Sequence, residues 1–305
     1  MVLFLEFAAA WDVYLAAAPF LPSRPAPPIG GCRRIEGVGA VADAFDLIVL
    51  DAYGVLHEGA EPYPAALEAF AALRARGKAV CVVTNAVTHA PGDVAARLTA
   101  LGFPLDAGEV VSGRSLLPDL LAGEQDQGSG IMVLGSHTAP VQERFPQAIA
   151  QDWTAEALDR ARGFLLIDTN GWMDDEPESR LGASLRANPR PLIVCNPDVT
   201  CPFLGKLSYE PGYFAFRLAA EIPDLPLRFL GKPYGAIYDR VAARFPGIAR
   251  ERILAVGDSP HTDVLGARSA GMAALLVESG LFRGRDTGRL LAECAILPDF
   301  IAPHL

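Results

Sequence analysis

Short apolar runs that alternate with amphipathic helical patterns extend through most of this chain. Phe45–Leu50 and Ala79–Val83 are apolar runs of strand length, and a helical pattern over 63–76 lies between them. Strands buried on both faces read as nearly continuous apolar runs, and parallel strands need a crossover, usually a helix, between them. The same alternation returns over 131–277. The sequence therefore predicts an α/β fold, with a doubly wound parallel sheet covered by helices.

Four polar residues stand just past the ends of predicted strands. They are Asp51, Thr84, Lys232 and Asp258. Ligands of open α/β sheets bind outside the carboxyl ends of the strands. If the four strands are neighbours, the four side chains converge on one crevice. Two carboxylates suit Mg²⁺, whereas an ammonium and a hydroxyl suit an anion, and together these groups are the components of a phosphoryl-transfer site.

The residues around these positions form an ordered set of motifs. The motifs are DAYGVLHEG from Asp51, Thr84-Asn85, Asn196-Pro197-Asp198, Gly231-Lys232-Pro233 and GDSPHTD from Gly257 to Asp263. In this order they resemble the haloacid dehalogenase superfamily of phosphohydrolases. The chain is most similar to class IIA, the branch of the N-acetylglucosamine-operon phosphatase, the pyridoxal phosphatases and the 4-nitrophenyl phosphatases. The resemblance covers residues 36 to 285.

The resemblance implies a Rossmann-like core with an inserted α/β cap domain. Only 33 residues separate Asp51 from Thr84, which leaves no room for a cap, whereas 148 residues separate Thr84 from Lys232. We therefore predict a core domain at 36–112 and 226–305 and a class IIA-type cap at 113–225. Residues 1–35 form an N-terminal extension and linker. Its apolar beginning is expected to pack on the body of the protein or to be a partly ordered leader.

The resemblance also implies the roles of the site residues. Asp51 would be the nucleophile and would form an aspartyl-phosphate. Mg²⁺ would be bound by Asp51, the backbone carbonyl of Tyr53 and Asp258. Thr84 would hydrogen-bond the phosphoryl oxygens, and Lys232 would neutralise charge on Asp51 and the phosphate.

The remaining motif residues would assist these groups. Asn85, Asn196 and Asp198, together with Thr84 and Lys232, are the candidates for substrate binding. Asp263 would support the site by holding Lys232 or the waters bound to the metal.

Tyr53 departs from the family pattern, in which an Asp at this position protonates the leaving alkoxide. A phenol is a poor base at neutral pH, and loss of a general acid-base costs on the order of 10²–10⁴ in rate. One interpretation is a phosphatase for good leaving groups, or one that uses His57 or Glu58 instead. A second is a binder of phosphorylated metabolites with weak or no turnover. A third is a 2-haloacid dehalogenase-like enzyme, which the cap position and the intact Gly257-Asp258 pair disfavour.

Composition excludes several other classes. The formal charge is −10, from 26 Lys and Arg against 36 Asp and Glu, and an acidic chain is a poor nucleic-acid binder. Five cysteines without C-x-x-C spacing argue against a disulfide framework, and no apolar run is long enough to span a membrane. We expect a cytoplasmic, Mg²⁺-dependent phosphohydrolase. Its partner would be a small phosphomonoester such as a sugar phosphate or nucleotide, and caps of this class often take part in homodimers.

Overall fold

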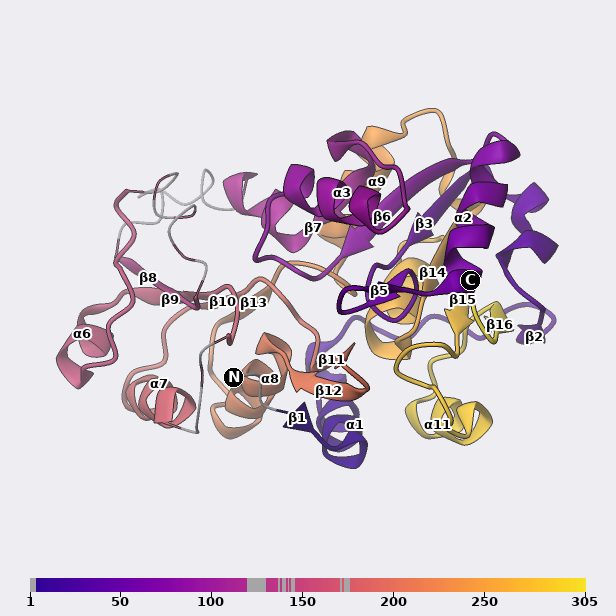
Figure 1. The fold of residues 1–305 in the computed structure, drawn as a ribbon. Helices are drawn as coiled ribbons and strands as arrows, with labels where there is room; N and C mark the ends of the chain where they lie inside the picture. The colour runs from indigo at the N-terminus through magenta and orange to yellow at the C-terminus, as the bar shows by residue number, and fades with distance from the viewer. Residues whose placement is uncertain are drawn as a thin grey trace.

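Two parallel sheets organise the chain (Figure 1). The computed structural model describes residues 4–119, 130–136, 138, 141, 143, 146–170, 172 and 176–305. The large sheet has the order β2, β16, β15, β14, β3, β6, β7, at Arg33–Arg34, Phe300–Ala302, Ala273–Val277, Ile253–Gly257, Leu47–Leu50, Ala79–Thr84 and Val110–Ser112. The small sheet has the order β13, β10, β9, β8, at Leu227–Phe229, Leu192–Val194, Gly163–Leu166 and Ile131–Leu134. The predicted α/β class is confirmed.

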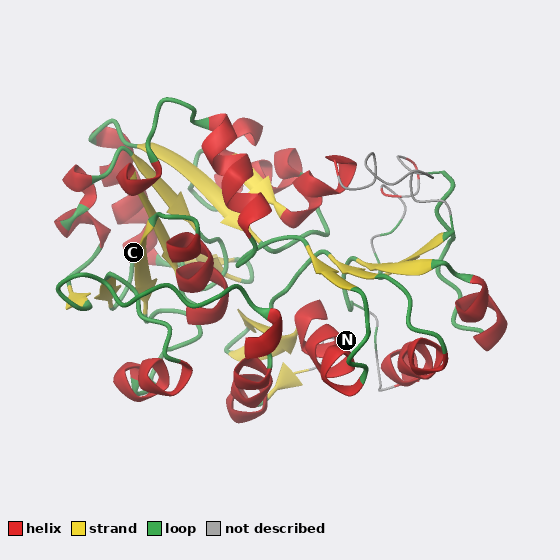
Figure 2. Cartoon of the chain, turned by 180° about the vertical axis from the view of Figure 1, so that it is seen from behind, coloured by secondary structure: helices red, strands yellow, loops and turns green. Residues whose placement is uncertain are grey.

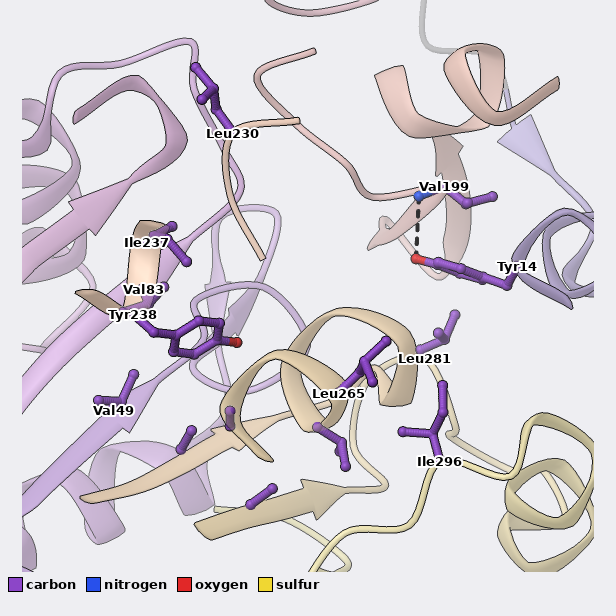
Figure 3. Packing of buried hydrophobic residues seen from close by; sticks show 14 of the residues in the cluster. Tyr14, Val49, Val83, Val199, Leu230, Ile237, Tyr238, Leu265, Leu281 and Ile296 are labelled. Atoms are coloured by element: carbon purple, nitrogen blue, oxygen red, sulfur yellow. Dashed lines mark hydrogen bonds between the residues drawn. The ribbon is translucent and has the colours of Figure 1, made fainter. Parts of the chain in front are cut away.

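Helices cover both faces of the large sheet. These helices are α2 (Pro64–Ala75), α3 (Pro91–Ala100), α9 (Gly235–Arg244), α10 (Leu265–Ser269) and α11 (Thr287–Cys294). Successive residues of β3 point to opposite faces: Ile48 packs with Phe70 of α2, whereas Val49 lies in the cluster of α9 and α10. Figure 3 shows this second cluster, with Val83 of β6 beside Ile237 and Tyr238 of α9. The sheet is therefore doubly wound and buried on both faces.

The small sheet has its own helical cover. Helices α6 (Ala155–Arg160), α7 (Glu176–Ala187) and α8 (Pro211–Glu221) lie along one side of it, as both cartoon views show (Figures 1 and 2). Phe164 of β9 packs there with Leu181 of α7 and Phe214 of α8. Between β10 and α8, the strands β11 (Thr200–Phe203) and β12 (Lys206–Tyr209) form an antiparallel hairpin. This β11–β12 hairpin projects toward the large sheet.

The predicted domain boundary at residue 226 is wrong by a few residues. Strand β13, at Leu227–Phe229, pairs in parallel with β10 and is the edge strand of the small sheet. The apolar run at 227–230 has strand length, but such a run does not state which sheet it joins. Lys232 therefore follows a strand of the small sheet rather than a neighbour of β3.

The N-terminal stretch packs on the body of the protein, which is one of the two alternatives expected for it. Strand β1 (Phe4–Leu5) pairs with β12, and helix α1 (Phe7–Ala16) buries Trp11 and Tyr14. Residues 21–31, which lie within the predicted extension and linker, contain no helix or strand. All five cysteines are free thiols. Within the described part of the chain, no helix combines the length and the apolar character that crossing a membrane requires.

The burial of β3 generates a stability prediction. Ile48 is fully buried in the centre of the large sheet, so Ile48→Ala should lower the free energy of unfolding by about 2–5 kcal/mol. Ile29 is fully exposed, and Ile29→Ala should change it by less than about 0.5 kcal/mol. Urea unfolding of both variants measures the difference. Equal losses in the two variants would contradict the burial assigned to β3.

Candidate active site

Three neighbouring strands of the large sheet end at one place. Strand β3 lies between β14 and β6, and Asp51, Thr84 and Asp258 stand at the carboxyl ends of these three strands. All three side chains line the same pocket. The parallel pairing brings together residues that are up to 207 positions apart in the chain. The predicted convergence is therefore found for these three groups.

Lys232 reaches the same place by a different route. The segment after β13 leads it under the pocket, where its side chain is buried. Its Nζ lies 2.6 Å from Asp51 Oδ1 and 2.7 Å from Asp263 Oδ1. Burial disfavours the ammonium charge, but the carboxylates of Asp263 and Asp51 outweigh it and hold the pKa of Lys232 well above its usual value. The lysine is therefore a fixed positive charge beside Asp51.

Acidic oxygens are in excess over this one cation. Carboxylate oxygens of Asp51, Asp258 and Asp263 lie within 4.8 Å of one another. Burial raises the pKa of Asp51 to about 7 in spite of Lys232, and burial with the charges of Asp51 and Asp263 raises the pKa of Asp258 well above its usual value. Hard oxygen ligands with uncompensated negative charge are the donor set that Mg²⁺ prefers. The cluster therefore fits a divalent cation.

Two glycines give the Asp258 carboxylate its space. Asp258 Oδ2 accepts a hydrogen bond from the backbone N–H of Leu281 at 2.7 Å. A Cβ on Gly54, or on Gly280, would stand 2.0 Å from this oxygen. Gly54 also has a φ of +78°, which a side chain would strain. The position of the Asp258 carboxylate thus requires glycine at both 54 and 280.

Asn85 links the core part of the site to the cap part. Its Oδ1 accepts the Lys232 backbone N–H at 2.8 Å, while its Nδ2 donates to Lys232 O at 3.1 Å and to Asp198 Oδ1 at 2.9 Å. Both amide hydrogens and the amide oxygen are thus engaged with protein groups. The side chain lines the pocket but is used to hold Lys232 and Asp198 in place, and its contact with a substrate stays a prediction.

The cap side of the pocket carries three further carboxyl groups, those of Asp168, Asp198 and Glu210. Asn196 Oδ1 accepts the Asp198 N–H at 2.9 Å, and Asn196 Nδ2 donates to Glu210 Oε2 at 2.9 Å. Glu210 Oε1 accepts from Ser208 Oγ at 2.6 Å. Burial raises the pKa of Asp198 and the pKa of Glu210 to about 7. Glu210 is not among the residues predicted from the sequence, since it belongs to no motif and its only signal is its place between β12 and α8.

Tyr53 occupies the pocket without offering a proton at neutral pH. Burial raises the pKa of Tyr53 to about 12, and its ring lies 4.4 Å from the ring of His57. His57 Nδ1 lies 2.9 Å from Gly59 O. Glu58 accepts hydrogen bonds from Tyr63 and Gly205 N. Neither is among the described residues that line the pocket, and a role of His57 or Glu58 in place of the missing acid stays a prediction.

The pocket between the two sheets is lined by polar and apolar side chains, with no basic residue among those described. Hydroxyls, amides and carboxyls surround it, and the hairpin residues Thr200–Phe203 contribute to its cap side. Among the described lining residues there is no lysine, arginine or histidine, and Lys232 lies beneath Asp51. Positive charge is thus offered at the floor of the pocket and not along its walls.

Comparison with known proteins agrees with this architecture. The family model of haloacid dehalogenase-like hydrolases matches residues 48–144, and a second HAD-hydrolase-like model matches residues 229–305. Together the two matches span more than half of the chain and leave residues 145–228 between them, which include β9, β10 and the β11–β12 hairpin.

Relatives that match most of this chain are named as phosphatases. The chain is 28% identical to the D-glycerol 3-phosphate phosphatase of Mycobacterium tuberculosis, covering 87% of this chain and 71% of the relative. It is also 28% identical to the glycerol-3-phosphate phosphatase of Gallus gallus, covering 88% and 93%. The crystal structure of a possible sugar phosphatase from Cytophaga hutchinsonii has the same fold, with a TM-score of 0.76, 23% identity and coverage of 89% and 98%.

The order of the motifs, the small sheet inserted between Thr84 and Lys232, and these relatives all agree. The chain belongs to the haloacid dehalogenase superfamily of hydrolases, in its class IIA branch.

Proposed function

We propose that this chain is an Mg²⁺-dependent phosphatase that hydrolyses small phosphomonoesters through an aspartyl-phosphate on Asp51. The observation that carries the proposal is the contact of Asp51 with a buried, charged Lys232 inside a cluster of three carboxylates. The curated relatives described above are named as phosphatases, which supports the same reaction.

The metal would be held by Asp51 and Asp258, with the backbone carbonyl of Tyr53 as a further ligand. Asp263 is the weaker candidate because its Oδ1 meets Lys232 Nζ and its Oδ2 accepts the N–H of Ser259 at 3.1 Å. We therefore assign Asp263 to the orientation of Lys232. When bound, Mg²⁺ supplies positive charge to the phosphoryl oxygens.

The protein groups divide the reaction between them. An oxygen of Asp51 forms a bond to phosphorus as the ester oxygen–phosphorus bond breaks, and water then cleaves the acyl-phosphate and releases Asp51. Lys232 balances the charge on Asp51 and on the transferred group. Thr84 Oγ1 accepts the Ala86 N–H at 3.1 Å, so its own hydrogen can be donated to a phosphoryl oxygen.

The leaving alkoxide needs a proton that Tyr53 is poorly suited to provide. Asp198 and Glu210 face the same pocket, and burial raises the pKa of each to about 7, so carboxyl protons are present there near neutrality. We propose that substrates with good leaving groups are hydrolysed fastest. Because Tyr53 stands where the family's acid would donate, turnover of simple alkyl esters is limited by proton donation.

The lack of basic side chains among the described lining residues of the pocket restricts the substrate class. A second phosphate or a carboxylate on the substrate would face Asp168, Asp198 and Glu210 with no lysine, arginine or histidine among the described lining residues. Hydroxyl groups can instead bond to these carboxyls and to the neighbouring amides. We therefore propose monophosphates of neutral polyols as substrates, in keeping with the glycerol phosphate phosphatases among the relatives.

The proposed function has a direct test. Purified protein is assayed with 4-nitrophenyl phosphate, glycerol 3-phosphate and fructose 1,6-bisphosphate, with Mg²⁺ and with EDTA. We expect Mg²⁺-dependent phosphate release, slowest from the bisphosphate, and background release from Asp51→Asn. Background release from the wild type, with inorganic phosphate still bound, would establish a binder instead. Metal-independent halide release from a 2-haloacid would establish a dehalogenase.

The crowding at Asp258 predicts the effect of one methyl group. Gly280→Ala would drive a Cβ into Asp258 Oδ2 and should weaken Mg²⁺ binding by about tenfold or more, measured by titration calorimetry. Gly247→Ala is the matched control, because its Cβ would meet nothing within 4 Å. Unchanged Mg²⁺ affinity in a folded Gly280→Ala protein would exclude Asp258 as a ligand.

Restoring the family's acid should relieve the limit set by Tyr53. Tyr53→Asp should raise the turnover of glycerol 3-phosphate on the order of tenfold or more and change that of 4-nitrophenyl phosphate little, because nitrophenolate leaves without a proton. Tyr53→Asn has the same size and no carboxyl group, and it should give no gain. Steady-state kinetics on both esters measures this. An equal gain from the Asn variant would refute the acid-base explanation.

A further inference from the structure

The proposed reaction leaves the N-terminal arm without a role. The arm comprises β1, α1 and the turn Ala18–Phe20, that is, residues 4–20. Figure 1 shows α1 beneath the β11–β12 hairpin, between α8 of the cap and α11 of the core. The arm therefore lies across the junction of the two domains, and its contacts on each side can be followed separately.

On the cap side, the arm extends the sheet that covers the pocket. Strand β1 pairs antiparallel with β12, with Phe4 opposite Ser208 and Leu5 opposite Leu207. Lys206 Nζ stands 4.7 Å from the centre of the Phe4 ring. The hairpin that lines the pocket with Thr200–Phe203 is thus the inner part of a three-stranded sheet whose outer strand is the arm.

On the core side, the arm is fixed by Trp11 and by the end of the turn. Trp11 Nε1 donates to Glu293 Oε2 of α11 at 2.9 Å, and its ring meets the ring of Phe282 edge-on at 5.8 Å. Tyr234 Oη donates to Phe20 O at 3.1 Å. These contacts join the arm to segments on either side of the Asp258 motif.

Tyr14 contacts both loops that carry site carboxylates. Its side chain is buried, and its Oη accepts the backbone N–H of Val199, next to Asp198, at 3.3 Å (Figure 3). Its ring stacks on His261 with centroids 4.5 Å apart and planes 11° apart. His261 lies between Asp258 and Asp263 in the π-helical turn Pro260–Val264 and is also met edge-on by Trp11 at 5.0 Å.

Movement of the Tyr14 side chain would affect both the Asp198 loop and the turn Pro260–Val264. The Val199 N–H is buried in the protein and needs an acceptor, which the phenol oxygen provides. Asp198 is in turn bonded to Asn85, which holds Lys232. A path of direct contacts therefore runs from Tyr14 through the Asp198 loop to the lysine beside Asp51.

We propose that Tyr14 is a positioning residue of the active site, by which the N-terminal arm holds the Asp198 loop and the hairpin over the pocket in the arrangement that binds substrate. This proposal rests on the proposed function only for the identity of the pocket as the active site. It assigns to residues 4–20 the work of keeping the cap side of the pocket in register with the core side.

The test compares two changes at Tyr14 with one on the exposed face of the same helix. Tyr14→Phe removes the hydroxyl that accepts the Val199 N–H and keeps the ring. Tyr14→Ala also removes the stack on His261, and Asp12→Ala removes an exposed carboxylate. For 4-nitrophenyl phosphate with Mg²⁺, Tyr14→Phe should raise KM about fivefold and change kcat less than twofold. Tyr14→Ala should raise KM further, and Asp12→Ala should match the wild type.

The split between KM and kcat separates positioning from a general structural role. Partial unfolding would reduce the active fraction, lowering kcat at constant KM and lowering the melting temperature. A wild-type KM for Tyr14→Phe, or a loss confined to kcat with a lower melting temperature, would overturn the proposal. Tyr14→Phe keeps the buried ring, so the test does not depend on the larger truncation.

A second measurement is independent of turnover. Amide hydrogen exchange of the substrate-free protein should be faster over residues 196–203 in Tyr14→Phe than in the wild type, with β3 unchanged. If no ester is hydrolysed, the proposed function fails and this exchange alone decides the role of the arm. Unchanged exchange over 196–203 would overturn the proposal whether or not the chain is a phosphatase.

Discussion

The buried contact of Lys232 with Asp51 and Asp263 is the interaction on which the site depends. An ammonium group at this depth is tolerated only because two carboxylates meet it at 2.6 and 2.7 Å. The two acids are in turn held close together by that cation. Asp258 stands beside them, and burial with the charges of Asp51 and Asp263 raises its pKa well above its usual value. A further positive charge would therefore stabilise the ionised carboxylates of this cluster, and a bound metal ion can supply that charge.

The fold supplies this cluster from two independent sources. Parallel pairing of β14, β3 and β6 places Asp258, Asp51 and Thr84 at one edge, and this depends only on the large sheet. Lys232 instead arrives after β13, the edge strand of the small sheet. Lys232 thus belongs to the segment that leads from the cap back to the core. Cap position and the charge beside Asp51 are thus linked through one short segment, and Asn85 clamps that segment from the core side.

The sequence predicted the parts of the site that follow strict local rules. Asp51 and Asp258 directly follow unbroken apolar runs, so their place at strand ends could be read without coordinates. Strand β13 was assigned to the wrong sheet, because an apolar run of strand length does not encode its pairing partner. Glu210 and Tyr14 were missed for a related reason. Their importance comes from neighbours about 10 to 250 positions away, which no spacing within the sequence reports.

Tyr53 and the N-terminal arm both indicate that catalysis in this chain depends more on charge and substrate orientation than on proton transfer. With a phenol in place of the family's acid, little of the catalytic power can come from proton transfer near Asp51. More of it must then come from the fixed charge of Lys232 and from substrate orientation, both of which require a well-placed cap. A third strand beside the hairpin and a buried tyrosine between two site loops restrict cap movement. The N-terminal arm therefore adds rigidity where the chemistry of this chain most depends on position.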